Sequence, residues 1–289
     1  DHEPALVACD DLLTEIAYPV IELGGGKIQP VMVAEKGPSW RTLHAEGTPG
    51  HASTPLGKQS ALEPLVEAIR ALLRSEGPML VGPEWRAFVD GLGAPPALAE
   101  ALVDPERIDS VIDEVAESDP GVARYLHACT RLTAAPTVVN AGTKANTIPD
   151  RGSVSVDMRL LPGQSPADAD RHLYDVLGAD LGGMSDEVHL AMGGNASPTS
   201  GRLWDALGAA YGSLGIDDLT PTMTPATTDA RFFRERGVRA YGAGWFDETA
   251  SFGEFLDMFH GNDERISVGS LDRTVDLLER VVLAYGAAR

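Results

Sequence analysis

Two consecutive strands are predicted by the segment Ile28-Gln29-Pro30-Val31-Met32-Val33-Ala34-Glu35-Lys36-Gly37-Pro38-Ser39-Trp40-Arg41-Thr42-Leu43-His44-Ala45-Glu46. On either side of Lys36-Gly37-Pro38 the composition and alternation are typical of partly buried strands. The Lys-Gly-Pro triplet itself has the residue types of a turn. A helix is expected next over residues 58–74, because apolar residues recur there at spacings of three and four.

The elements expected further along complete a small unit. They are strands at 137–140, 152–160 and 186–191 and a helix at 165–178. Within the second of these strands, Val154, Val156 and Met158 alternate with polar residues, which predicts one buried face. The order strand, helix, strand, strand, helix, strand is the ferredoxin-like split β-α-β pattern. Residues 77–131 contain many Pro and Gly residues and short helical patterns, and we expect them to form a helical insertion in this unit.

After Gly193-Gly194 the pattern changes. Helices and strands alternate up to residue 289, which predicts part of an α/β layer. Residues 1–36 also predict α/β elements, but too few to close a sheet. We therefore expect an α/β fold in which one domain, formed by residues 1–36 and 194–289, is split around an inserted domain at 37–193. Most of the first half of the split domain is expected to be absent.

Composition excludes several classes of protein. The 289 residues carry a formal net charge of −20, which argues against nucleic acid or an anionic membrane surface as partner. No run of 18 apolar residues predicts a membrane span. The two cysteines, Cys9 and Cys129, form neither a disulfide framework nor a CxxC zinc site, so a cytoplasmic location is expected. The start, Asp1-His2-Glu3-Pro4, predicts the interior of a longer protein.

Polar residues in six short segments are the candidates for chemistry. They are Ala34-Glu35-Lys36-Gly37, Gly50-His51-Ala52-Ser53-Thr54-Pro55, Asn146-Thr147-Ile148-Pro149-Asp150, Asp157-Met158-Arg159-Leu160-Leu161-Pro162-Gly163, Thr228-Asp229-Ala230-Arg231 and His260-Gly261-Asn262-Asp263-Glu264. His260 lies among carboxylates and amides that can fix its tautomer, as a metal-ligating histidine requires. Taken alone, it is equally a surface histidine.

In this order, the six segments resemble a family of zinc metallopeptidases and amidohydrolases. The family includes acetylornithine deacetylase, succinyl-diaminopimelate desuccinylase, aminoacylase, dipeptidases and carboxypeptidase G. The resemblance implies hydrolysis of an amide or peptide bond in a small acyl-amino acid or peptide with a free carboxylate. It also implies two Zn²⁺ ions per active site, with Co²⁺ or Mn²⁺ as alternatives, and a homodimer formed through the inserted lid domain.

The resemblance assigns roles to three residues of the catalytic centre. Glu22, in Ile21-Glu22-Leu23-Gly24, and His260 would each bind a zinc ion. His51 would cross the dimer interface and donate a hydrogen bond to the oxyanion in the partner's active site. From the residues alone, Glu22 is equally a solvated carboxylate and His51 a histidine without a special role. The resemblance also leads us to expect Glu22 and His260 within metal-bridging distance of each other.

Four further residues would contact the substrate. Arg159 would clamp the substrate carboxylate, and Asn146, expected beside it on an adjoining strand, would hydrogen-bond the substrate. Thr228 and Asp229, together with Thr227, would line the pocket. Two alternatives remain open: Arg159 pairs with Asp157 or Asp150, or Thr228 or Asp229 caps a helix.

Other family features cannot be found in this chain. The His-x-Asp motif and the Glu-Glu pair that contains the general base do not occur in the expected order, so the chain is expected to begin after the general base and to supply two metal ligands. The alternative function is a catalytically inactive dimerisation and lid module. In either case the helix at 58–74 is expected at a two-fold interface through the stripe Leu62, Leu65, Ile69 and Leu72.

Overall fold

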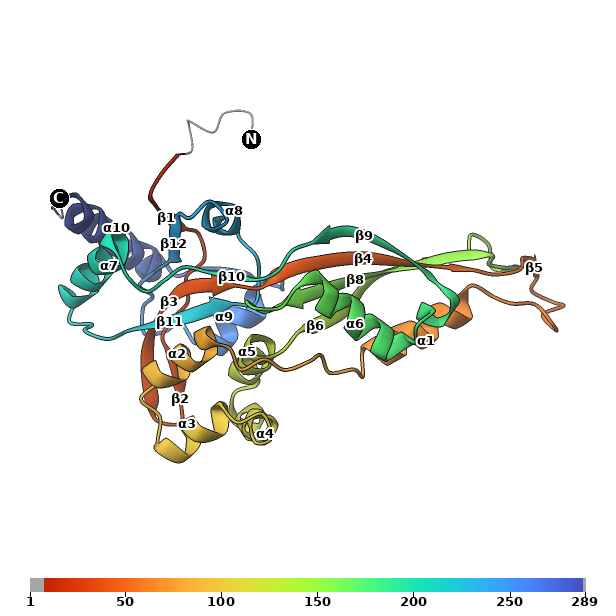
Figure 1. Ribbon diagram of the computed structural model, residues 1–289, viewed down its shortest axis with the longest axis horizontal. Coiled ribbons are helices and arrows are strands. Elements are labelled where there is room, and N and C mark those ends of the chain that lie inside the picture. Colours follow the sequence, from red (N-terminus) through yellow and green to blue (C-terminus); the bar gives the residue numbers. More distant parts are fainter. Residues whose placement is uncertain (1–7, 288–289) are drawn as a thin grey trace. The chain divides into compact units, whose positions relative to one another are not determined.

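The computed structural model describes residues 8–287 and divides them into two compact units (Figure 1). Unit 1 contains residues 8–35, 81–130 and 195–287, and unit 2 contains residues 36–80 and 131–194. Each unit has its own sheet with helices packed on it, so the fold is mixed α/β. The chain therefore crosses between the units at Glu35–Lys36, Leu80–Val81, Thr130–Arg131 and Gly194–Asn195.

Strand β3 (Gly26–Glu35) is the centre of unit 1. It pairs with four other strands, antiparallel with β2 (Ile21–Leu23), β10 (Asn195–Ala196) and β12 (Arg239–Gly242) and parallel with β11 (Leu219–Thr224). A further strand, β1 (Asp11–Thr14), pairs with β12 in parallel. All of β3 except Lys27 is buried, as expected of a strand that is covered on both faces.

Eight helices of unit 1 pack around this sheet. They are α2 (Pro83–Gly91), α3 (Pro96–Leu102), α4 (Ile108–Ser118), α5 (Pro120–Thr130), α7 (Arg202–Gly212), α8 (Ala230–Arg234), α9 (Phe252–Met258) and α10 (Val268–Ala287). Helix α2 packs on β11, and α7 packs on α10. Within residues 8–287, no helix combines the length and apolar character needed to cross a bilayer.

The helical segment 81–130 packs with unit 1 rather than with the lid in which its insertion was expected. An aromatic cluster explains this placement. The ring of Tyr125 on α5 lies 5.9 Å from Phe88 on α2 and 5.0 Å from Phe252 on α9. Its hydroxyl donates to the carbonyl of Met223, 3.0 Å away on β11. Aromatic rings bury large apolar areas, so these contacts hold the helices against the unit 1 sheet.

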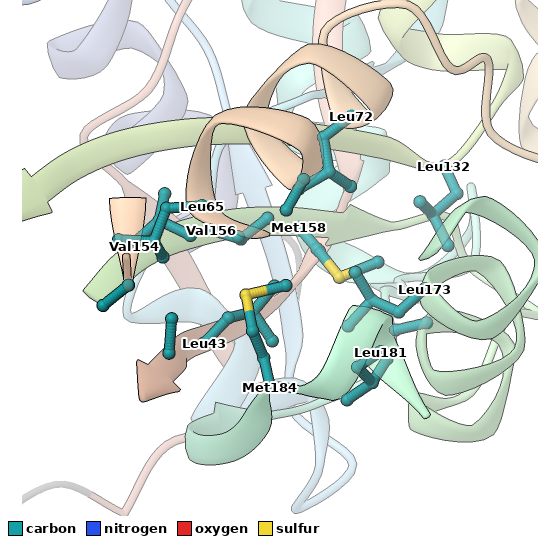
Figure 2. Close-up of a cluster of buried hydrophobic side chains, with 14 of the residues drawn as sticks. Leu43, Leu65, Leu72, Leu132, Val154, Val156, Met158, Leu173, Leu181 and Met184 are labelled. Atoms are coloured by element: carbon teal, nitrogen blue, oxygen red, sulfur yellow. The ribbon is translucent and has the colours of Figure 1, made fainter. Parts of the chain in front are cut away.

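Unit 2 is a four-stranded antiparallel sheet with the order β6-β8-β4-β9. Its elements follow the chain as β4 (Gly37–Glu46), α1 (Leu62–Leu72), β6 (Thr133–Ala141), β8 (Arg151–Leu160), α6 (Pro166–Leu177) and β9 (Ser185–Ala191). The two helices cover one face, where Leu65 and Leu72 of α1 meet Leu173 of α6 (Figure 2). Val156 and Met158 point into the same core, so the alternation predicted for residues 152–160 is confirmed.

The predicted turn at Lys36-Gly37 joins strands of two different sheets. Strands β3 and β4 lie in separate units, so this segment does not form a hairpin. Gly37 is required by close backbone packing, since a Cβ there would lie 2.1 Å from the carbonyl oxygen of Met192. Lys36 is fully buried, and its ammonium donates to the carbonyl of Arg131 at 2.8 Å and to the hydroxyl of Thr133 at 3.1 Å.

Replacing Leu65 with Ala is expected to lower the free energy of unfolding by about 2–5 kcal/mol, because it removes a fully buried side chain from a closely packed core. The exposed neighbour Glu67 provides the control, since Glu67→Ala should change this free energy by less than about 0.5 kcal/mol. Urea unfolding of both variants measures the difference. Equal effects would contradict the placement of Leu65 in the core.

Candidate functional site

His51 and Asn146 lie together at one end of unit 2. His51 belongs to the short strand β5 (Gly50–His51), which pairs with β7 (Thr147–Ile148) immediately after Asn146. The backbone N–H of Ala52 donates to the carbonyl of Asn146 at 3.0 Å. The structure therefore brings these two predicted site residues to one exposed end of unit 2, beyond β4 (Figure 1).

The hydrogen bonds of His51 define which ring nitrogen can donate. The backbone N–H of Ser53 donates to His51 Nδ1 at 3.2 Å, and the Ser53 hydroxyl lies 2.7 Å from the same nitrogen. A backbone N–H can only donate, so Nδ1 acts as the acceptor and the neutral ring carries its proton on Nε2. This tautomer presents an N–H donor, as a group that stabilises an oxyanion must.

Arg159 lies on the open face of the same sheet. Its Nε and Nη2 donate to the two carboxylate oxygens of Asp157 at 2.7 and 2.9 Å, and its guanidinium lies 5.7 Å from the ring centroid of Trp40. The pairing with Asp157 that was left open as an alternative is therefore present. Asp157 and Trp40 orient the guanidinium on the face opposite the core.

The expectation that Arg159 lies beside Asn146 is wrong. Arg159 pairs with Pro38 at one end of β8, whereas the β5–β7 pair follows the opposite end, where Arg151 pairs with Glu46. Arg159 lies eight positions after Arg151, a separation of roughly 27 Å at the rise of an extended strand. Register along β8, which cannot be deduced from the short motifs, separates the two side chains within one subunit.

Glu22 lies on β2 in unit 1, opposite Lys27 of β3. Its carboxylate is 3.1 Å from the Lys27 ammonium, and both side chains are about two-thirds exposed. Glu22 lines a cavity of about 750 Å³, and Trp245, Asp247 and Arg273 line the same cavity. Hydrogen bonds from Ser267 and Thr249 lower the pKa of Asp247 to about 2, so this carboxylate is charged at neutral pH.

His260 follows α9 in an exposed turn. Its backbone adopts the left-handed region with φ of 53°, and Asp263 does so as well with φ of 58°. Non-glycine residues adopt this region infrequently, and functional sites hold an excess of such positions. The approach of His260 to Glu22 stays a prediction.

The described residues do not by themselves form a metal site. Between residues 8 and 287 there is no group of three or more His, Cys, Asp or Glu side chains placed to hold a metal ion. Zinc sites in proteins use three or four protein ligands. That Glu22 and His260 supply two of them stays a prediction.

Thr228 and Asp229 precede α8, and Asp229 is its N-cap residue. The buried Thr228 hydroxyl accepts a hydrogen bond from the N–H of Ala230 at 3.2 Å, which closes the turn just before the helix. Asp229 is exposed and its side chain makes no capping hydrogen bond. Thr228 therefore fixes the local backbone, and Asp229 presents its carboxylate to the surface of unit 1.

Glu35, in the motif Ala34-Glu35-Lys36-Gly37, was not predicted to be a site residue. Glu35 is fully buried, and its Oε2 accepts hydrogen bonds from the N–H of Thr228 at 2.9 Å and from its hydroxyl at 2.6 Å. Burial raises the pKa of Glu35, and this effect exceeds the opposing effects of Thr228 and Arg234. The signal available in the sequence was a glutamate at the end of a strand predicted to be buried. Its hydrogen-bond partner, Thr228, could not be found from the sequence because it lies 193 positions away.

Comparison with known proteins identifies the family. Residues 33–184, more than half of the chain, match the family model described as the M20 peptidase dimerisation domain. The chain belongs to the M20 peptidase family. The matched region begins in β3 and ends just before β9, so it contains most of unit 2.

Individual proteins are similar to this chain in sequence or in fold. This chain is 29% identical over 173 residues to the probable carboxypeptidase S-like 2 of Dictyostelium discoideum. The aligned region covers 59% of this chain and 32% of that protein. The M20 metallo-carboxypeptidase Sso-CP2 of Sulfolobus solfataricus superposes with a TM-score of 0.65 at 15% identity, over 98% of this chain and 65% of that one. Human carnosine dipeptidase 1 gives a TM-score of 0.65 at 13% identity, over 98% and 60%. The chain thus spans less than two thirds of these relatives.

The raised pKa of Glu35 has a consequence for stability. A carboxyl group whose pKa is higher in the folded chain than in the unfolded chain holds its proton more tightly when folded, so stability falls as pH rises from the unfolded to the folded pKa. Gln cannot titrate. We therefore compare the free energy of unfolding of the wild type with that of Glu35→Gln at each pH. As pH rises above about 4.3, the pKa of a glutamate in an unfolded chain, the wild type is expected to lose stability relative to the variant. Urea titrations over a pH series test this, and parallel curves would contradict it.

Proposed function

We propose that this chain forms part of a metal-dependent hydrolase. Its substrate would be a small acyl-amino acid or peptide with a free carboxylate, and the bond cleaved would be an amide or peptide bond. Membership of the M20 family supports this class of reaction. The observation that carries the proposal furthest is the tautomer of His51, which presents Nε2–H as a donor at the exposed end of the lid sheet.

His51 would act on the oxyanion. When water attacks an amide carbonyl, negative charge develops on the carbonyl oxygen, and a fixed N–H donor lowers the energy of that state. His51 and Asn146 lie at the end of unit 2 that is remote from Arg159, and this separation supports a role in the active site of a partner subunit. Asn146 would hydrogen-bond the same substrate.

Arg159, Thr228 and Asp229 would contact the substrate. Arg159 has the planar donor geometry that binds a carboxylate through two parallel hydrogen bonds, and Asp157 fixes its orientation. Thr228 and Asp229, with Thr227 before them, would line the pocket at the start of α8.

Glu22 and His260 would bind zinc, with Co²⁺ or Mn²⁺ as alternatives, in a site that holds two ions. The remaining ligands and the general base would come from polypeptide that the longer relatives contain. Helix α10 supports this view. Its residues Val268, Leu271, Val275 and Val282 are at least half exposed and follow a spacing of three, four and seven. Such an apolar face is typical of a helix that further polypeptide covers.

The domain plan that follows is a split catalytic domain with an inserted lid. Unit 2 has the strand order β6-β8-β4-β9 and two helices on one face, which supports its assignment as the ferredoxin-like lid. Unit 1 would be the catalytic domain, which now includes the helical segment 81–130.

The dimer would form through α1 and the outer edge of β6. The stripe expected from the sequence needs correction, because Leu65 and Leu72 are only 1% exposed and pack inside their own subunit. Leu62, Val66 and Leu73 are 43%, 60% and 69% exposed and lie on one side of the helix. Strand β6 ends the sheet order, and an open sheet edge beside an apolar helix face is suited to pairing with a second copy.

A charge in this stripe is expected to separate the subunits. The double variant Val66→Glu, Leu73→Glu places two carboxylates in the proposed interface, where their desolvation is unfavourable. Sedimentation at micromolar concentration should show a dimer for the wild type and a monomer for the variant. Glu67→Lys, on another side of α1, is the control and should stay dimeric. A wild type that sediments as a monomer would contradict the proposal.

Subunit mixing tests the role of His51 in the full-length protein. His51→Ala alone should lower kcat by about 10²–10³, the effect of removing one oxyanion donor, and His260→Ala alone should abolish activity. In a mixed dimer of the two variants, one site would combine an intact His260 with the intact His51 of the other subunit. Random mixing should then restore about a quarter of wild-type activity, since half of the dimers would each hold one complete site.

Two other outcomes of this experiment are informative. If His51 served its own subunit, every site in the mixture would lack one of the two histidines and mixing would restore nothing. If the full-length wild type hydrolyses no amide or peptide substrate with any of the three metals, the inactive dimerisation and lid module is the better description.

A further inference from the structure

Glu35 lies at a special point of the chain. It is the last residue of unit 1 before the chain first enters unit 2, and Asn195, opposite it in the β3–β10 pair, is the first residue of the last return to unit 1. Both residues belong to unit 1. The side chain of Glu35 is fully buried although it carries a carboxyl group.

Among the described residues, Thr228 is the one whose backbone N–H donates a hydrogen bond to the Glu35 carboxylate. Its Oε2 accepts from both the N–H and the hydroxyl of Thr228. The same hydroxyl accepts from the N–H of Ala230. One carboxylate oxygen is therefore connected to the turn at residues 225–229 and, through the Thr228 hydroxyl, to the first residue of α8.

The other end of α8 is attached to the same strands. The guanidinium of Arg234 lies 3.5 Å from Glu35 Oε2 and 3.3 Å from Asn195 Oδ1, and its Nε donates to the Ser197 hydroxyl at 3.1 Å. Arg234 is buried as well, and its Nη2 donates to the carbonyl of Ala240 at 2.9 Å. Helix α8 has only five residues, so these side-chain contacts, rather than its own backbone bonds, hold it in place.

Burying the Glu35 carboxyl group beside Arg234 is a poor way to stabilise the fold. Glu35 Oε1 is buried and has no hydrogen-bond partner within the described part of the chain. A buried acceptor without a partner costs about 1–3 kcal/mol, and buried ion pairs such as Glu35–Arg234 are often no more stable than apolar residues of the same size. Positions that break local rules in this way are concentrated at functional sites.

We propose that Glu35 is a positioning residue that holds the turn 225–229 against β3 and thereby places Thr228 and Asp229 for substrate contact. The consequence for substrate rests on the function proposed above, whereas the placement of the turn is measurable without substrate. Glu35 does not itself contact the substrate, since its side chain is fully buried beneath Thr228.

Amide hydrogen exchange of the full chain tests the placement. Thr228→Val removes the hydroxyl but keeps the shape of the side chain, and it should speed exchange at the amides of Thr228 and Ala230 by roughly tenfold or more, the scale of a lost charge-assisted hydrogen bond. Thr228→Ser keeps the hydroxyl and should retain slow exchange. Thr222→Val is the matched control, because the Thr222 hydroxyl is buried without a hydrogen-bond partner among the described residues.

Two variants of Glu35 separate position from charge. Glu35→Gln keeps an acceptor oxygen at the position of Oε2 and should leave exchange at Thr228 within about twofold of wild type, while Glu35→Asp keeps the charge but withdraws the oxygen by one methylene and should speed exchange. These variants also decide the question if Thr228→Val does not fold. Unchanged exchange in Thr228→Val and Glu35→Asp, or an equal rise in exchange throughout unit 1, would overturn the proposal.

Kinetics of the same variants separate the two proposals. Displaced Thr228 and Asp229 should raise KM more than they lower kcat in Glu35→Asp, with Glu35→Gln close to wild type. Faster exchange at Thr228 in a protein without hydrolase activity would retain the positioning role and reject the proposed function. Hydrolase activity with unchanged exchange would do the reverse.

Discussion

The structure depends on two buried charges of opposite sign at one peptide bond. Glu35 and Lys36 are both fully buried, and the chain passes from unit 1 to unit 2 between them. Successive side chains of an extended segment point to opposite sides, so the carboxylate can bond to Thr228 in unit 1 while the ammonium bonds to Arg131 and Thr133 in unit 2. Burying either charge without partners would be strongly unfavourable. The crossing point is thereby limited to one register.

Strand β3 extends this constraint through unit 1. Because it pairs with four strands, a shift of its register would move Glu35 away from Thr228 and would also change the pairing of β11 and β10. A one-residue shift reverses which side chains face each way along a strand. The position of the turn before α8 and the position of the return strand are therefore set by the same strand.

The sheet of unit 2 has one face packed in the core and one open face. Leu43, Val156 and Met158 face α1 and α6 in the core (Figure 2). Trp40, Asp157 and Arg159 occupy the open face. The length of the strands then places His51 and Asn146 at the far end. Arg159 therefore lies near β4 Pro38, whereas His51 and Asn146 lie remote from it. The proposed dimer would use both groups of residues.

The sequence by itself determined the strands of unit 2, the inward direction of Val154, Val156 and Met158, and the resemblance of six motifs to the family, because alternation and motif spacing are local properties. Only the tertiary structure decided that the helices at 81–130 pack with unit 1, that Leu65 and Leu72 belong to the core of unit 2, and that Arg159 lies far from Asn146. It also decided that Glu35 accepts two hydrogen bonds from Thr228. Each of these depends on partners distant in sequence, through aromatic packing, strand register or a buried hydrogen bond, and no local pattern encodes such a partner.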